Sequence, residues 1–360
     1  MKNKKIVKLI IVSLIAFLGI FSFAYESFVN SVISQFLSSR QIYDDYGQLS
    51  VHFVDVGEAD AIAINFPNGD VGMIDCGDES KSSLVMSYID QFVLTGKRNN
   101  HINYFFFTHC DNDHIGGIKR IVSNYDVDAV YRPRQYCSFE TIEDKNGYIS
   151  TSETYEDTIT AINQKEIKLT TVFDNMEFFV GDTNIKIFCR NKRYEDSNDC
   201  SYFIKITYKN QSILFTGDAS SQVESDVMEL HADELKSDYL KVAHHGSKYS
   251  SSAEFLACVR PKVAIISVGN NIYGHPTEAT LSRLDACGAK VYRTDIDGSV
   301  LVNLGESSKV LNDSYAKDSF GLDCGTLFII IEIFNLIVIQ KEFVLAIKNR
   351  KKLKKLRTKL

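Results

Sequence analysis

Short apolar or alternating runs recur along the chain between about residues 49 and 305. Several alternate apolar and polar positions, which is typical of half-buried strands. The runs are VHFVDV, AIAINF, VGMID, INYFFFTH, IKLTTVF, SYFIKITY, SILFTGD, YLKVAHH, KVAIISV, KVYRT and SVLVNL. The early runs follow one another closely, whereas longer segments separate the later ones. This order predicts a two-layer sheet core covered by helices.

Helix-like segments lie between these runs. They are residues 79–95, 114–125, 153–163, 219–234, 250–258 and 277–288. The stretch 131–165 is otherwise polar and irregular, which is typical of a loop or an insert over a site. We expect residues 49–305 to form one main domain, because 360 residues contain little linker-like composition.

Both ends of the chain differ in composition from its body. Residues 1–24 place four Lys before an apolar run and contain no acid, which predicts a signal peptide or a membrane anchor. Residues 306–360 are first hydrophobic and then basic, a pattern typical of a segment that contacts a membrane surface or an anionic polymer, or of a solvated tail. We therefore expect an exported protein, either extracellular or on the outer face of the cell membrane.

Composition and charge exclude several classes of protein. With 44% hydrophobic and 24% charged residues, the chain is neither disordered, nor collagen-like, nor a multispan membrane protein. Between residues 25 and 340 stand 27 basic and 45 acidic residues, a formal charge of about −18. Such a body argues against a broad nucleic-acid-coating surface, but a local groove neutralised by metal ions stays open.

Eight cysteines are present, and none forms a CxxC pair. Their spacing does not resemble a small disulfide scaffold, so most are expected to be buried or free thiols. In an exported chain, one or two bridges are compatible with this number.

The main candidate for chemistry is YFFFTHCDNDHIGG, residues 104–117. It places four potential ligands within six residues, after a buried strand: His109, Asp111, Asp113 and His114. Imidazole together with carboxylate suits Zn²⁺, Mn²⁺ or Fe²⁺. We expect Gly116 and Gly117 to let the backbone turn tightly into the next helix.

Two later strands also end in polar side chains. SILFTGD ends in Asp218, a carboxylate that can bridge two metal ions or cap the following helix. YLKVAHHGS ends in His244 and His245. Adjacent strand side chains point to opposite faces, so we expect one of the two His to bind metal and the other to hydrogen-bond substrate or a carboxylate.

Two further residues complete the candidate site. His275, in IYGHPT, is a candidate for phosphate contact or proton donation, although a turn His packed on Tyr273 is an equally good interpretation. Asp75, at the end of VGMID, is interpreted as orienting the ligand loop, with a plain turn Asp as the alternative.

Taken in order, VHFVDVGEADA, MIDCG, THCDNDHIGG, FTGDA, LKVAHHGS, SVGNNIYGHP and YRTDIDGSV resemble the metallo-β-lactamase superfamily. Within it they resemble the branch typified by the extracytoplasmic domain of the competence protein ComEC, over residues 49–303. Bacterial phosphorylcholine esterase has a similar ligand run. The resemblance implies an α+β fold, a four-layer αββα sandwich with the site at one edge of the two sheets.

The resemblance also implies a ligand set for one or two divalent ions, Zn²⁺ or Mn²⁺. His109 and Asp111 would hold one ion, Asp113 and His114 the other, and Asp218 would bridge them. His244 or His245 would complete the second site; we assign His244 as ligand and His245 to catalysis.

The chain departs from the superfamily pattern in two places. Asp111 stands where His is usual, and no His lies between His114 and Asp218. In that interval, NDCSYFIK offers Asn198 and Ser201 as polar residues beside the site. The first metal is therefore under-ligated, and β-lactam hydrolysis is less favoured than other hydrolytic reactions.

These features favour a hydrolase that uses a metal-activated water, with Asp113, His275 and His245 as catalytic residues. We expect a phosphodiesterase acting on nucleic acid, possibly DNA, or on a choline- or teichoic-type phosphodiester. A membrane contact through the N-terminal segment, and through the basic tail, is expected. The alternatives are a non-catalytic, membrane-tethered binding protein on a degenerate hydrolase fold, and a structural site for a single metal.

Overall fold

A computed structural model describes residues 47–94, 100–134, 152–305 and 309–312. These residues belong to one compact unit, Tyr43–Ser314. The expected signal or anchor at 1–24 and most of the C-terminal extension lie outside the described residues. Among the described helices, none combines the length and the apolar composition that crossing a bilayer requires.

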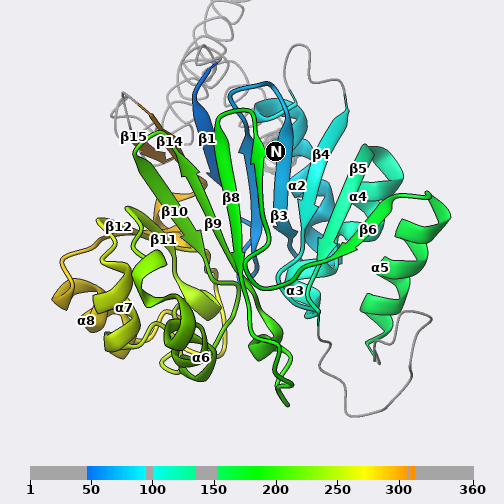
Figure 1. Ribbon diagram of the computed structural model, residues 1–360. Helices are drawn as coiled ribbons and strands as arrows, with labels where there is room; N and C mark the ends of the chain where they lie inside the picture. Colours follow the sequence, from blue (N-terminus) through cyan, green and yellow to red (C-terminus); the bar gives the residue numbers. More distant parts are fainter. Residues whose placement is uncertain (1–46, 95–99, 135–151, 306–308, 313–360) are drawn as a thin grey trace, which may run out of the picture. The chain divides into compact units, whose positions relative to one another are not determined.

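The described strands form two mixed sheets (Figure 1). The first has the order β15 (Lys309–Asn312), β14 (Val300–Leu304), β1 (Leu49–Phe53), β2 (Ala61–Asn65), β3 (Val71–Cys76), β4 (His101–Phe106), β5 (Asp126–Arg132) and β6 (Lys168–Thr171). The second has the order β13 (Lys290–Arg293), β12 (Val263–Ile266), β11 (Tyr239–Lys241), β10 (Gln211–Phe215), β9 (Phe203–Tyr208), β8 (Thr183–Phe188) and β7 (Glu177–Val180).

Helices connect the strands and cover the sheets. On the side of the first sheet are η1 (Glu79–Lys81), α2 (Ser82–Phe92), α3 (Asn112–Ile115), α4 (Ile118–Asn124) and α5 (Glu153–Gln164). The second half contains η2 (Asn198–Cys200), α6 (Ser221–His231), η3 (Ala232–Glu234), η4 (Ala243–Gly246), α7 (Ala253–Val259), α8 (Glu278–Ala286) and α9 (Thr294–Asp297).

Three hydrophobic clusters define the layers. The central one joins inward-facing residues of both sheets; Phe53 of β1 stacks on Phe215 of β10 at 6.1 Å between ring centroids. A second cluster packs α2, α4 and α5 on the outer face of the first sheet, and a third packs α6, α7 and α8 on the second. Alternating side chains let each strand serve two layers at once. The expected αββα sandwich is therefore confirmed.

The sequence pattern missed some elements. The hairpin β7–β8 at the edge of the second sheet, the edge strand β15 and the short helix α9 were not anticipated. The helix expected at 114–125 is divided into α3 and α4 around Gly116 and Gly117. In the central sheets, β3 to β6 and β10 to β13 run parallel, so their carboxyl ends meet at one edge, where ligands usually bind in such sheets.

Candidate metal centre

The ligand run begins where the buried strand β4 ends and continues into α3. The chain turns at Gly116 and Gly117 between α3 and α4, as expected, but their backbone angles are ordinary (φ −55° and −81°), so the turn itself does not require glycine. A Cβ on Gly116 would lie 2.6 Å from Glu79 N, three residues after β3, and one on Gly117 would lie 2.8 Å from the carbonyl oxygen of Cys76. The glycines instead let the ligand helix pack directly on the end of β3.

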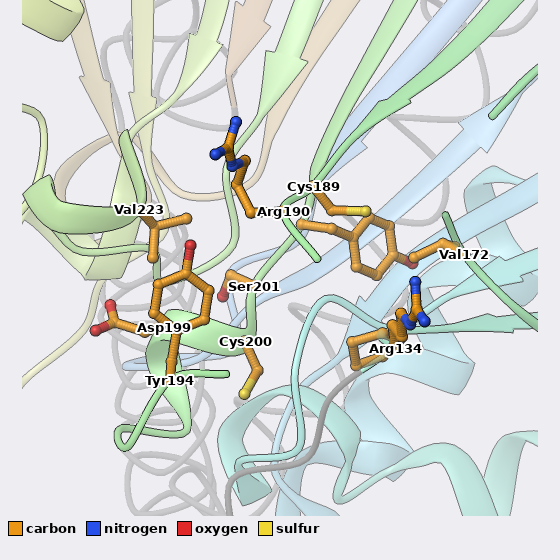
Figure 2. A pocket seen from close by; sticks show the side chains of 11 residues that line it. Arg134, Val172, Cys189, Arg190, Tyr194, Asp199, Cys200, Ser201 and Val223 are labelled. Atoms are coloured by element: carbon orange, nitrogen blue, oxygen red, sulfur yellow. The ribbon is translucent and has the colours of Figure 1, made fainter. Parts of the chain in front are cut away.

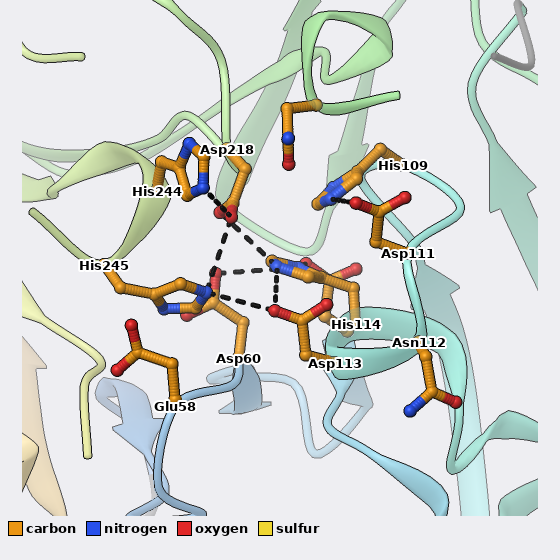
Figure 3. Close-up of polar contacts among 12 residues, drawn as sticks. Glu58, Asp60, His109, Asp111, Asn112, Asp113, His114, Asp218, His244 and His245 are labelled. Carbon is orange, nitrogen blue, oxygen red and sulfur yellow. Dashed lines mark hydrogen bonds and ion pairs between the residues drawn. The ribbon is translucent and has the colours of Figure 1, made fainter. Parts of the chain in front are cut away.

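Four side chains converge on one point at this edge (Figure 3). The potential ligand atoms of Asp113, His114, Asp218 and His245 all lie within 4.8 Å of one another. His245 Nε2 is 3.3 Å from Asp113 Oδ2 and 3.4 Å from Asp218 Oδ2, and His114 Nε2 is 3.4 Å from Asp218 Oδ1. Two imidazoles and two carboxylates form a donor set that suits Zn²⁺ or Mn²⁺. We call these four residues the metal cluster.

Asp75 fixes the orientation of His114 from behind. Its backbone is left-handed (φ +55°), and its carboxylate accepts hydrogen bonds from Thr108 N (2.8 Å), Thr108 Oγ1 (2.7 Å) and His114 Nδ1 (2.8 Å). With Nδ1 engaged, His114 presents Nε2 to the cluster, and this buried atom has no hydrogen-bond partner. A buried, unpartnered imidazole nitrogen fits a metal ion, because leaving it unpaired is otherwise costly.

His109 and Asp111 lie beside the cluster, with 3.9 Å between His109 Nε2 and Asp111 Oδ2. His109 Nδ1 is 3.1 Å from Thr108 Oγ1, whereas its buried Nε2 again has no hydrogen-bond partner. Burial, and secondly the charge of His114, hold the pKa of His109 well below its usual range. The ring is therefore neutral, as a metal ligand must be. Burial raises the pKa of Asp111, although a hydrogen bond from Ser197 acts to lower it.

Asp218 sits on the loop after β10 and faces both halves of the site. Its backbone N–H donates to Ser201 Oγ (3.0 Å), and Gly217 packs so closely on Thr108 and Ser201 that a Cβ would meet them at 2.8 Å. Ser201 therefore positions the Asp218 loop. Asn198, the other residue expected beside the site, donates its amide to Asp196 Oδ1 (3.0 Å) within its own turn.

The two adjacent histidines leave strand geometry before they reach the site. His244 and His245 both have left-handed backbones (φ +49° and +50°) in η4, so the rule of alternating strand faces does not apply to them. His245 joins the metal cluster, and Ser267 O holds its Nδ1 at 2.7 Å. His244 is 30% exposed, with Nε2 at 3.9 Å from Asp218 Oδ2. The geometry thus brings His245, rather than His244, into the cluster.

Sequence reasoning missed a buried ion pair behind the cluster. Lys241, the last residue of β11, and Asp60, which precedes β2, are each 1% exposed and are joined by a salt bridge. Lys241 Nζ also donates to Gly217 O (3.2 Å) and lies 3.5 Å from Asp218 Oδ1. The available signal was a lysine inside the apolar run YLKVA, where an unpaired charge would be expensive.

The charges of the cluster are strongly coupled. Burial alone would raise the pKa of Asp218, but the positive charges of His245, His114 and Lys241 hold it well below its usual range. Burial alone would lower the pKa of His245, whereas the Asp218 carboxylate and a hydrogen bond to Asp113 raise it to about 9. In the metal-free protein, protons on the imidazoles therefore balance the carboxylates.

His275 lies beside His244 and is paired with a residue that the sequence pattern did not reveal. Its Nδ1 is 3.0 Å from Glu58 Oε1, and Gly269 N donates to Glu58 Oε2 (3.1 Å). The ring also stacks on Tyr273, with 5.7 Å between centroids. Both sequence interpretations of His275 are therefore compatible with its position, because the ring packs on Tyr273 while Nε2 is not engaged by Glu58.

A small pocket lies around Ser201, whose Oγ accepts the Asp218 backbone N–H (Figure 2). Ser201 belongs to both its wall and the metal centre. Two arginines, Arg134 and Arg190, also line the pocket, and Arg190 forms a salt bridge with Glu229 at 3.2 Å. Cys200, in the same wall, is disulfide-bonded, whereas Cys76, Cys110, Cys189, Cys258 and Cys287 are free thiols.

Comparison with known proteins agrees with the fold and the motifs. Residues 54–270, more than half of the chain, match the family model of the metallo-beta-lactamase superfamily. The chain therefore belongs to the metallo-β-lactamase superfamily, as the motifs indicated. Among solved structures, the metallo-beta-lactamase fold protein YhfI from Bacillus subtilis has a TM-score of 0.48 and 10% identity, covering 71% of this chain and 100% of that one.

Within the superfamily, several curated proteins are similar to parts of the chain, and a competence protein is among them. The chain is 28% identical over 266 residues to ComE operon protein 3 of Bacillus subtilis, covering 69% of this chain and 32% of that protein. It is 38% identical over 111 residues to competence protein ComA of Neisseria gonorrhoeae, covering 31% and 16%. The chain spans about a third or less of the length of these relatives. The resemblance to the ComEC branch is confirmed.

Proposed function

We propose that this chain is a metal-dependent phosphodiesterase. The observation that carries the proposal is the metal cluster, with the unpartnered Nε2 atoms of His114 and His109 facing it. Asp113, His114, Asp218 and His245 would hold one divalent ion, and His109 with Asp111 would help to hold a second, with Asp218 between them. When bound, such ions supply Lewis-acid activation of a water molecule and of the phosphoryl group.

The chain's own residues supply orientation and protons. Asp113 is 37% exposed in its side chain, so its carboxylate can accept a hydrogen bond from an incoming water while it contacts His245. Glu58 holds Nδ1 of His275, which leaves Nε2 to donate to a substrate or leaving-group oxygen. His244, partly exposed beside it, is a second donor for phosphoryl oxygens. The sequence assigned His244 to metal and His245 to catalysis; the cluster geometry supports the opposite assignment.

Substrate class and location form part of the proposal. Similarity to competence proteins supports nucleic acid, possibly DNA, ahead of choline- or teichoic-type phosphodiesters. The disulfide at Cys200 supports an exported protein, because such bonds persist in oxidising compartments. We propose that residues 1–24 direct or anchor the hydrolase domain, 49–305, at the outer face of the membrane, with 306–360 as an additional membrane contact.

The test is metal content together with turnover. The full chain, purified without chelator, is analysed for Zn and Mn and assayed with bis(p-nitrophenyl) phosphate after either ion is added back. We expect one to two equivalents of metal and metal-restored turnover, which Asp113→Asn abolishes while the fold is retained. Asp182→Asn, in an exposed turn between β7 and β8, is the matched control and keeps full activity.

If the protein binds metal but shows no turnover with either ion, the result would favour a non-catalytic binding protein. The observation behind that alternative is the small number of ligands near His109. Among the described residues, Asp111 is the acidic side chain paired with His109 Nε2, at 3.9 Å. Full turnover in Asp113→Asn would overturn the catalytic assignment itself.

A further inference from the structure

The loop that follows β12 exposes two large apolar side chains beside the metal centre. Ile272 is 94% exposed and its neighbour Tyr273 is 71% exposed. Together they form an apolar patch on the loop, and exposed apolar patches can mark binding sites. The feature therefore calls for an explanation beyond packing.

The loop is held rigidly by the side chain of Asn271. Its Oδ1 accepts the backbone N–H of Tyr273 and of His275, each at 3.0 Å. Its Nδ2 donates to the carbonyl oxygens of Gly269 (2.9 Å) and His275 (2.8 Å). Four hydrogen bonds from one amide fix the turn, so the exposed tyrosine is pre-organised, which lowers the entropic cost of binding a ligand.

A series of rings connects this tyrosine with the metal centre. Tyr273 stacks on His275 with an interplanar angle of 26°, and His275 meets His244 edge-on, with 5.4 Å between centroids. His244 in turn lies 3.9 Å from Asp218. These contacts lead from Asp218 of the metal cluster to the exposed ring of Tyr273, so the ring is within reach of a substituent on a substrate bound at the cluster.

We propose that Tyr273 is a stacking subsite for the nucleobase next to the scissile phosphate. This inference rests on the proposed phosphodiesterase function. A single flat ring on a rigid loop suits a planar base, because every base has a π-face and stacking is tolerant of sequence. A quaternary ammonium group is better recognised by a cage of several aromatic faces, and among the described residues the ring contact of Tyr273 is with His275 alone.

The experiment compares two phosphodiesters that differ in the base. In the full chain, Tyr273→Ala is expected to lower the ratio of kcat/KM for thymidine 5′-(p-nitrophenyl phosphate) to that for methyl p-nitrophenyl phosphate by about tenfold, the order of magnitude of one base stack. Tyr273→Phe keeps the ratio. Phe179→Ala, which removes a 67%-exposed ring on the edge strand β7, is the matched control and leaves the ratio unchanged.

A binding assay separates this inference from the hydrolytic function. Anisotropy of a fluorescein-labelled ten-nucleotide oligo(dT) is measured in EDTA, and Tyr273→Ala is expected to weaken the Kd by a similar factor. If no ester is cleaved but Tyr273 still controls oligo(dT) binding, hydrolysis is refuted and the subsite stands. The subsite is overturned if Tyr273→Ala leaves the ratio unchanged, or if it lowers kcat/KM for p-nitrophenylphosphorylcholine alone. It is also overturned if the protein neither binds oligo(dT) nor turns over any ester.

Discussion

Lys241→Met removes a buried cation from behind the metal cluster with little change in side-chain length. In the native protein, Lys241 pairs with Asp60, donates to Gly217 O and lies 3.5 Å from Asp218 Oδ1. Without it, Asp60 keeps His114 Nδ1 at 3.7 Å and the charge of His245, and its Oδ1 already lacks a hydrogen-bond partner. The variant thus leaves a buried carboxylate without its main counter-charge.

The magnitude follows from the burial of both partners. Removing one member of a buried ion pair typically destabilises by about 3–5 kcal/mol, since the other charge is left uncompensated. For a domain of this size, that loss lowers the Tm of the metal-free protein by about 6–20 °C. A divalent cation then meets a more negative cluster, so the rise in Tm on adding Mn²⁺ or Zn²⁺ should be larger in Lys241→Met than in the native chain.

Differential scanning calorimetry in EDTA and with added metal measures both effects. The double variant Asp60→Asn/Lys241→Met removes the whole pair and should recover most of the lost Tm. Lys262→Met is the matched control, because Lys262 is 79% exposed in its pair with Asp238 and such surface pairs contribute about 1 kcal/mol or less. A metal-free Tm equal to that of the native chain, or an identical metal-induced rise in both proteins, would refute the reasoning.

Three further predictions concern neighbouring features. His245→Gln should lower the bound metal to well under half of the native content, whereas His244→Gln keeps it; the reverse, measured by elemental analysis, would show that His244 is the ligand. The pKa of His245 is raised to about 9 in the metal-free fold, so its stabilising contribution is complete below the unfolded value of about 6.5 and is lost as pH rises through about 9. The metal-induced rise in Tm should therefore grow across that range, because metal displaces this proton; a rise independent of pH contradicts it. Gly246→Ala should destabilise by about 1–3 kcal/mol in urea unfolding, because its Cβ would lie 2.5 Å from Pro276 and its φ is +87°; an unchanged midpoint would show that the two loops move apart freely.

The sequence determined the local chemistry of this protein. The spacing of His109, Asp111, Asp113 and His114 after an apolar strand placed the ligand run correctly at a strand end, because both features depend on residues close together in the chain. The hairpin β7–β8 was missed although Gly181 and Asp182 provide a turn signal between alternating segments. The edge strand β7 buries one of its four side chains, so its apolar pattern is weak.

Only the tertiary structure decided which distant side chains share the site. Glu58 and His275 are 217 positions apart, and His245 and Asp113 are 132 apart, so no local pattern pairs them. The choice between His244 and His245 depends on two left-handed backbone conformations, which the residue types do not dictate. In the sequence, Lys241 only interrupts an apolar run; the fold shows that it pairs with Asp60. Sequence spacing thus specifies which groups can bind a metal, whereas long-range packing specifies their partners, their charges and the direction in which they point.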